Sequence, residues 1–370
     1  MDFTPTAEQV DAAQLADMIF GDHCTPERLK AVDAQGDRFD RELWRRLGSS
    51  GLLGLPLPEE YGGSDLGLLE ACSVLVEAGR RLAPVPLATH TVAALAIAEH
   101  GSDAQRAAWL PRAADGSAVL TSAVAEELSH LPAEPTTRAE QDGSRWLLTG
   151  TKVAVPAGTV AEVFVVPATT ADGPTVFLVS RDADGLTVQP QRTSDGDEVA
   201  RLVLDGAAVP VDDSLGPIGG GDRVTAWLAE RLAVAVCAQQ VGTVHGALAL
   251  TAGYARTREQ FGRPIGSFQA VSQRLADGYI DVLGAELTLW QAAWRLSEGL
   301  PAECAVATAK LWAADAGHRL AHTTVHVHGG VGIDLDGEAH RFFTTAKRHE
   351  FWLGGTTEQA RDLGRLLART

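Results

Sequence analysis

The sequence predicts an α+β protein in which a β domain lies between two helical domains. Apolar residues recur at three- and four-residue spacing in the first 117 residues and again from residue 221. Between them, short β-branched runs are separated by Gly, Asp and Pro. The length of 370 residues is enough for two or three packed domains. We therefore expect an N-terminal helical domain (1–117), a central antiparallel β-barrel or sandwich (118–220) and a C-terminal four-helix bundle (221–370).

The helices are predicted from the spacing of apolar residues and from the positions of proline and glycine. A proline-free stretch over 223–260 predicts one long helix of about 57 Å at about 1.5 Å per residue. The remaining helices are expected at 5–20, 40–54, 69–101, 267–298, 302–328, 338–350 and from 356. Strands are expected at 144–156, 162–168, 174–180, 185–191 and 199–211.

Composition excludes several classes of function. The net charge is -17, with 31 Lys and Arg against 48 Asp and Glu, which argues against nucleic acid as a partner. The N-terminus carries acids where a signal peptide needs bases, and no uninterrupted apolar run reaches the ~18 residues of a membrane span. The cysteines show no metal or redox spacing, so we expect them to be reduced and buried, and we expect no metal site: Cys24, Cys72, Cys237 and Cys304. The expected location is the cytoplasm, away from membranes.

The stretch "RTREQFGRPIGSFQ" (256–269) follows the long helix. Arginines there complement the negative end of a helix dipole, which is the simplest interpretation. The alternative is a phosphate and nucleotide clamp formed by Arg258 and Gln269, with Phe261 packed on a ring.

Three segments carry a family resemblance. "YARTREQFGRPIGSFQAVSQRLAD", "HVHGGVGIDLDGEAHRFFTTAK" and "GLLGLPLPEEYGGSDLGLLE" resemble signatures of the acyl-CoA dehydrogenase family, in the family's order. The resemblance implies the acyl-CoA dehydrogenase fold, with FAD extended between two subunits. It also implies that one half of that FAD site reaches the neighbour's cofactor, and that this half comprises Arg258, Phe261, Gln269, His326 (where Gln is usual), Gly329 and Gly330.

The half-site for the chain's own flavin departs from the family pattern. The family's T-E-P-G-A-G-S-D loop corresponds to "VAEELSHLPAEP" (124–135), where we expect Glu126, Glu127 and His130 to crowd the flavin. A second family segment corresponds to "KVAVPAG" (152–158), in which Pro156 has no N–H to donate.

No catalytic base is expected. The family's usual glutamate precedes a Gly-Thr pair, a position that falls on Gly354, or on Leu353 after a slip of one residue. A second family solution places the glutamate on the long helix, where Leu232 stands instead; Glu230 is two residues away, and Glu358 is a weaker candidate.

One kept half-site and one altered half-site suggest a subunit that serves another subunit's FAD. This resembles the incomplete subunit of heteromeric (α2β2) acyl-CoA dehydrogenases of actinobacterial steroid catabolism. The resemblance implies a homologous catalytic partner and an acyl-CoA substrate bound at the complex. Two alternatives remain open: a self-sufficient homotetrameric dehydrogenase that uses Glu230, and a non-enzymatic scaffold for a partner flavoprotein.

Overall fold

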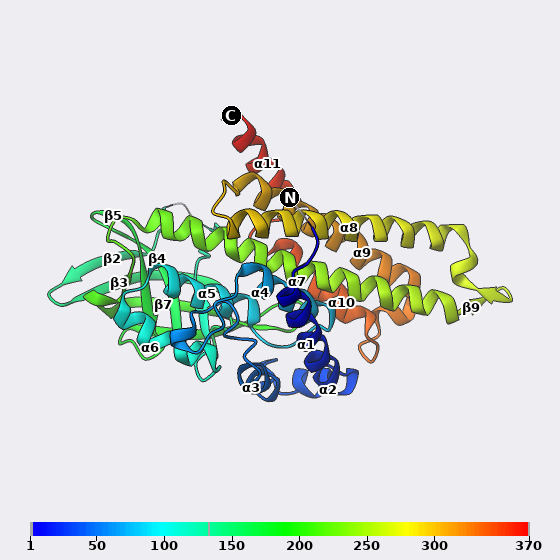
Figure 1. Cartoon of the computed structure of the whole chain (residues 1–370), viewed down its shortest axis with the longest axis horizontal. Coiled ribbons are helices and arrows are strands. Elements are labelled where there is room, and N and C mark those ends of the chain that lie inside the picture. Colours follow the sequence, from blue (N-terminus) through cyan, green and yellow to red (C-terminus); the bar gives the residue numbers. More distant parts are fainter. Residues whose placement is uncertain (1–2, 132–133, 369–370) are drawn as a thin grey trace. The chain divides into compact units, whose positions relative to one another are not determined.

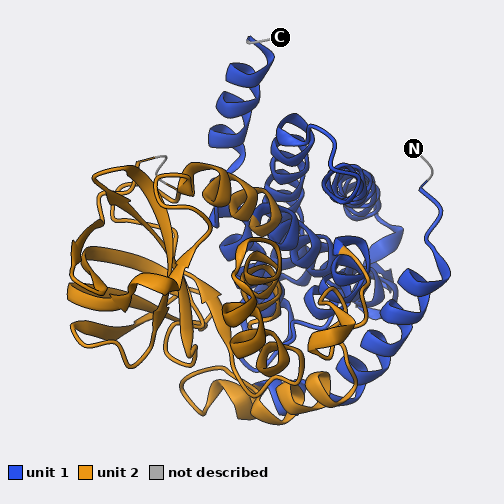
Figure 2. Ribbon diagram, turned by 60° about the vertical axis from the view of Figure 1, so that its left-hand side comes forward, with its two compact units in different colours: residues 1–29, 68–83, 233–370 blue, residues 30–67, 84–232 orange. Residues whose placement is uncertain are grey.

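The computed structural model describes residues 3–131 and 134–368. The chain forms two compact units (Figure 2). Unit 1 comprises residues 1–29, 68–83 and 233–370, and unit 2 comprises residues 30–67 and 84–232. Both units therefore draw on the N-terminal helical region.

Unit 1 consists mainly of helices, most of which Figure 1 labels. The helix α7 (Gly221–Thr257) begins in unit 2 and ends in unit 1, and α2 (Pro26–Asp33) also crosses the boundary. The other long helices of unit 1 are α1 (Ala7–His23), α4 (Leu68–Arg80), α8 (Gln269–Ser297), α9 (Glu303–His328), α10 (Ala339–Phe351) and α11 (Thr356–Leu367). Its core includes Leu82, Val244, Ala247, Val282, Leu320 and Phe342.

Glycines allow α4 and α7 to approach closely within unit 1. A Cβ atom on Gly79 would lie 2.0 Å from the Gln239 carbonyl oxygen, and one on Gly242 would lie 1.8 Å from the Val76 carbonyl oxygen. Neither position accepts a larger residue without moving a backbone, so these glycines set the spacing of the two helices.

Unit 2 combines one mixed sheet with the helices α3 (Arg41–Ser49), α5 (Leu87–His100) and α6 (Asp103–Ala114). The strand order is β6-β7-β3-β2-β4-β5-β8, and β1 also pairs with β4. The strands are β1 (Leu120–Ser122), β2 (Arg138–Asp142), β3 (Arg145–Pro156), β4 (Val163–Thr170), β5 (Gly173–Ser180), β6 (Leu186–Arg192), β7 (Glu198–Pro210) and β8 (Ser214–Leu215).

The α+β class is confirmed, with two corrections of detail. The pairings β1–β4 and β2–β4 are parallel, so the sheet is not purely antiparallel. The helix expected over 69–101 is two helices, α4 and α5, because Leu82 has a φ of 53° and Pro84 and Pro86 follow it.

The buried His90 fixes α5 against the sheet of unit 2. Its Nδ1 atom accepts from the Leu120 amide at 3.2 Å, so its Nε2 atom carries the proton and donates to the Ala113 carbonyl at 3.1 Å. Burial lowers the pKa of His90 to about 4, so the ring stays neutral near pH 7.

The structure can be compared with the expectations about membrane-spanning segments and about the cysteines. By length and composition α7 alone, among the helices of the described ranges, is apolar enough to cross a membrane, and its apolar stretch is 78% buried inside the protein, as in a core helix. All four cysteines are free thiols; Cys72 and Cys237 are buried as expected, whereas Cys24 and Cys304 are only partly buried.

Candidate cofactor half-site

The predicted clamp begins where α7 ends. The Arg258 amide donates to the Tyr254 carbonyl at 2.8 Å, and the Arg258 carbonyl accepts from the Ile265 amide at 2.8 Å. Between these two bonds the chain forms a hairpin of β9 (Glu259–Gln260) and β10 (Arg263–Pro264). Its two turn residues, Phe261 and Gly262, have φ of 53° and 76°. A two-residue type I′ turn requires such positive φ values at both positions.

This hairpin presents its side chains outward. Phe261 is 93% exposed, and the ring of Phe268 lies 6.1 Å away, edge to face. The Arg263 guanidinium lies 4.2 Å above the Phe268 ring, whereas Arg258 is exposed and makes no ion pair with the described residues. An exposed Phe and an unpaired Arg three positions apart in the chain are suited to contact another molecule.

The second predicted segment lies at the end of α9. His326 is exposed in the last turn of α9, and Gly329 ends the helix with a φ of 65°. A Cβ atom on Gly329 or Gly330 would meet nothing within 4 Å, so the backbone here is open to close approach.

Ring stacking brings the two segments together within unit 1. The rings of Tyr254 on α7 and His328 on α9 stack with centroids 4.3 Å apart. Gln269, the exposed first residue of α8, follows the hairpin directly. The predicted residues thus come from the end of α7, the start of α8 and the end of α9. Their role in cofactor binding stays a prediction.

These residues fit the pyrophosphate and adenosine of FAD. Arg258 offers a charge that no described carboxylate neutralises, and the start of α8 carries the positive end of a helix dipole. The open backbone at Gly329 and Gly330 leaves space for a planar group. This part of the chain could therefore hold one side of a dinucleotide.

The position of the family's usual base carries no carboxylate. Leu353 and Gly354 have φ of 62° and 94°, and the Gly354 carbonyl accepts from the buried Lys310 Nζ at 2.9 Å. Lys310 also donates to the carbonyls of His349 and Glu350, each at 3.1 Å. Burial lowers the pKa of Lys310 to about 8.

Other glutamates are engaged in structural contacts. The Glu230 carboxylate lies 4.0 Å from the Arg231 guanidinium. The Glu358 carboxylate accepts from the Gly355 amide at 3.1 Å and caps the first turn of α11. Glu350 is buried and accepts from His318 and from Lys347, the latter at 2.5 Å.

Glu126 does not crowd a flavin as expected. Its buried carboxylate accepts from the Lys152 ammonium at 2.8 Å, and from the amides and hydroxyls of Thr136 and Thr137 at 2.6–3.0 Å. Burial alone would raise the pKa of Glu126, but these hydrogen bonds outweigh it and lower the pKa to about 2. Glu126 therefore has a structural role: it stabilises the sheet of unit 2 by binding Lys152.

The neighbouring backbone has few free donors. In "KVAVPAG" the Ala154 amide donates to the Gln191 side chain at 3.0 Å, and the Val153 amide donates to the Ala125 carbonyl at 3.0 Å. Pro156 has no N–H, and its carbonyl accepts from Thr121. Of the other residues expected to crowd the flavin, Glu127 pairs with Arg201 and His130 is exposed. Positions 132–133 of the same loop lie outside the described residues.

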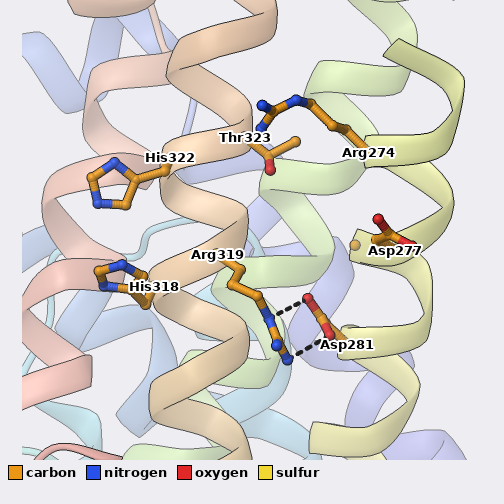
Figure 3. Close-up of a pocket in the computed structure, with 8 residues that line it drawn as sticks. Arg274, Asp277, Asp281, His318, Arg319, His322 and Thr323 are labelled. Atoms are coloured by element: carbon orange, nitrogen blue, oxygen red, sulfur yellow. Dashed lines mark hydrogen bonds and ion pairs between the residues drawn. The ribbon is translucent and has the colours of Figure 1, made fainter. Parts of the chain in front are cut away.

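A groove of about 320 Å³ lies between α8 and α9 (Figure 3). Its Arg319 guanidinium binds both oxygens of Asp281, at 2.7 and 2.9 Å, while Arg274 and Asp277 oppose each other in charge. The groove therefore carries no excess charge for an anion. No group of three or more metal-ligating side chains was found in the described ranges.

Models of one protein family match most of this chain. They are the N-terminal, middle and C-terminal domains of acyl-CoA dehydrogenase, at residues 6–117, 123–206 and 219–366. The chain belongs to the acyl-CoA dehydrogenase family. The family consists of FAD-dependent flavoproteins, which confirms the predicted fold and cofactor.

Several relatives match over their full length. The acyl-CoA dehydrogenase FadE27 of Mycobacterium tuberculosis is 47% identical over 100% of both chains. A chain of the ChsE4-ChsE5 complex from the same organism superposes with a TM-score of 0.95 at 47% identity, covering 100% of both chains. A chain of the Tcur3481-Tcur3483 steroid acyl-CoA dehydrogenase gives a TM-score of 0.91 at 42% identity, covering 98% of both chains.

The sequence alone did not reveal two features of the site. The Tyr254–His328 stack joins residues 74 positions apart, and only the packing of α7 against α9 brings the rings together. Lys310 lies in an apolar stretch, "VATAKLW", with no local sign that three carbonyls converge on it.

Proposed function

We propose that this chain is the catalytically incomplete subunit of a heteromeric (α2β2) acyl-CoA dehydrogenase. It donates one half of an FAD site to a homologous subunit that supplies the catalytic carboxylate. The complex introduces an α,β double bond into the acyl-CoA thioester of a steroid side chain, in the cytoplasm.

One observation carries this proposal: an exposed, preformed half-site coexists with a base position that has no carboxylate. Phe261 is 93% exposed and Arg258 is unpaired among the described residues, as expected of groups that complete their contacts in another subunit. At the base position, Leu353 and Gly354 cannot accept a proton. The similarity to one chain of a two-protein complex and to a steroid dehydrogenase supports the partner and the substrate class.

The chemistry divides between the two subunits. FAD, when bound, accepts the hydrogen and electrons removed from the β-carbon of the thioester. In this chain Arg258 and Gln269 bind and orient the cofactor's phosphate and adenosine parts, and Phe261 shields them from water. The partner removes the α-proton.

Flavin content tests the proposal. The chain is purified alone and with a homologous acyl-CoA dehydrogenase subunit, and the visible flavin absorbance is counted per polypeptide. We expect a colourless lone chain, about one FAD per heterodimer, and loss of that FAD in Arg258→Ala. Arg256→Ala, an exposed arginine on the same helix end, is the matched control and should keep it.

Other results would favour the alternatives. A yellow lone chain whose dehydrogenase activity disappears in Glu230→Gln would mean a self-sufficient enzyme. Full flavin in the Arg258→Ala complex would mean that the chain is only a scaffold.

A further inference from the structure

Two stacked rings connect the ends of α7 and α9 in the candidate half-site. The rings of Tyr254 and His328 have centroids 4.3 Å apart and planes 20° apart, and both side chains are half-buried. Tyr254 lies one helical turn before Arg258, and its carbonyl accepts from the Arg258 amide at 2.8 Å. His328 directly precedes Gly329, which ends α9 with a φ of 65°. The stack therefore connects the turn that carries Arg258 to the backbone at Gly329.

A hydrogen bond fixes the orientation of the His328 ring. Its Nδ1 atom lies 2.8 Å from the Thr324 carbonyl oxygen, one turn earlier on α9. Because a carbonyl oxygen only accepts, Nδ1 carries the proton and donates. The imidazolium form also carries a proton on Nδ1, so this bond is available to the ring in both charge states. The ring face that meets Tyr254 is thus set by a contact within α9 itself.

A second contact joins the same two helices one turn away. The hydroxyls of Thr251 on α7 and Thr324 on α9 are hydrogen-bonded at 3.1 Å, and both residues are fully buried. Thr251 lies three residues before Tyr254, and Thr324 lies four residues before His328. The buried hydroxyl pair and the ring stack therefore follow each other along the contact between α7 and α9, and together they fix the separation of the two helix ends.

The turn after α9 packs directly on His328. Gly332 lies buried in the short helix η4 (Gly329–Ile333). A Cβ atom on Gly332 would lie 3.1 Å from the His328 Cβ atom and 2.8 Å from the Val325 carbonyl oxygen. The absence of a side chain at Gly332 allows this close approach. The position of His328 and the path of the backbone after α9 are therefore coupled.

A fixed separation matters for a ligand that contacts both segments. In the proposed function Arg258 binds phosphate, and the open backbone at Gly329 and Gly330 admits the adenosine part of the same dinucleotide. A guanidinium binds phosphate best through two parallel N–H donors, so the contact depends on its position and direction. A displacement of about 1 Å is enough to weaken a contact of this kind strongly. Stacked aromatic rings have a preferred geometry and so restrict such displacements.

We infer that Tyr254 and His328 are positioning residues for the cofactor. Their stack holds Arg258 and Gly329 at the separation that one dinucleotide requires, and neither ring has to touch the dinucleotide to do so. The inference rests on the proposed function and deepens it, because it adds two residues to the six of the predicted half-site. It also means that Tyr254 contributes its ring and not its hydroxyl.

The rate of FAD release from the heteromeric complex tests the inference, followed as the rise in flavin fluorescence after dilution. Tyr254→Leu and His328→Asn each remove one ring and should each raise the rate about five- to tenfold, the factor expected for an aromatic pair. Tyr254→Phe keeps both rings and should leave the rate unchanged. His322→Asn is the matched control: it removes from the same helix a ring that contacts Phe343 at 5.4 Å, and it should not alter the rate.

A double-mutant cycle separates positioning from general stabilisation of the fold. Arg258→Lys keeps the charge but loses the two-donor fork. In a complex with Arg258→Lys, His328→Asn should raise the release rate by less than about twofold, because the geometry that the stack sets is already lost. A ring that only stabilises the fold would give the same factor in both backgrounds, and that result would overturn the inference.

The same measurements distinguish the failure of the two proposals. If Arg258→Lys speeds FAD release while Tyr254→Leu and His328→Asn do not, the positioning role is wrong and the half-site of the proposed function stands. If Arg258→Lys and both ring variants leave the rate unchanged, the clamp itself is wrong and both proposals fall.

Discussion

Replacing Lys310 by Met should cost more stability at alkaline than at neutral pH. Lys310 is fully buried and donates to three carbonyl oxygens, so its removal at pH 7 leaves these oxygens unpaired at a cost of about 1–3 kcal/mol. Its pKa is about 8 in the folded chain, because of burial, and 10.5 as the reference value for the unfolded chain.

The direction of the pH effect follows from proton counts. Between pH 8 and 10.5 the unfolded chain binds more protons at this lysine than the folded chain does, so the free energy of unfolding rises with pH in this window. The gain is about 1.4 kcal/mol per pH unit, or about 2 kcal/mol between pH 7 and 9.5. The Met variant lacks this gain. The destabilisation caused by Lys310→Met should therefore grow by about 2 kcal/mol over the same interval.

Urea unfolding at both pH values measures this difference. Both proteins would carry Cys237→Ala, because burial raises the pKa of that thiol from 9.0 to about 12, so that the thiol of the unfolded chain would otherwise titrate in the same pH interval. Lys30→Met, at an exposed lysine on α2, should cost the same at both pH values. A destabilisation by Lys310→Met that is equal or smaller at pH 9.5 would refute the reasoning, since the buried ammonium would then keep its proton.

Three further changes test other parts of the structure. Lys152→Met leaves the Glu126 carboxylate buried without its cation and should lower the free energy of unfolding by about 3–5 kcal/mol, whereas adding Glu126→Leu should recover part of the loss. Phe261→Ser should leave the unfolding of the lone chain unchanged, because this ring is 93% exposed, and should reduce flavin retention in the complex. Gly354→Ala, at a φ of 94°, should lower the melting temperature through a strain of about 1–3 kcal/mol, while Gly364→Ala, in open space on α11, should not.

Periodicity in the sequence was enough to predict most helices and strands. The long helix was expected over 223–260 and is α7, because no proline interrupts an apolar 3.6-residue period. The strand β2 was not expected, because four of its five residues are exposed and polar. Its place in the sheet comes from pairing with β3, which local patterns do not encode.

The local conformation of the candidate site was predictable only where a motif coincides with a local backbone requirement. The hairpin carrying Phe261 needs two successive turn residues with positive φ, and Gly262 in the motif is one of these two residues. The assignment of Glu126 to the flavin side was wrong because its environment depends on a residue that is distant in the sequence. Its partner Lys152 is 26 residues away, and only the folded sheet shows that the two charges neutralise each other in the interior.

At the position of the family's usual base, both the backbone and the side chain are unsuited to holding a carboxylate. Gly354 has a φ of 94°, which a glutamate would adopt only with strain, and its carbonyl is held by Lys310. The Gln359 side-chain amide donates a hydrogen bond to the Leu353 carbonyl at 2.9 Å, and the Glu358 carboxylate accepts one from the Gly355 amide. Gly354→Glu would therefore have to disturb this bonded turn before its carboxylate could act. A segment fixed in this way is consistent with a subunit that keeps the family fold to support a partner's chemistry instead of performing its own.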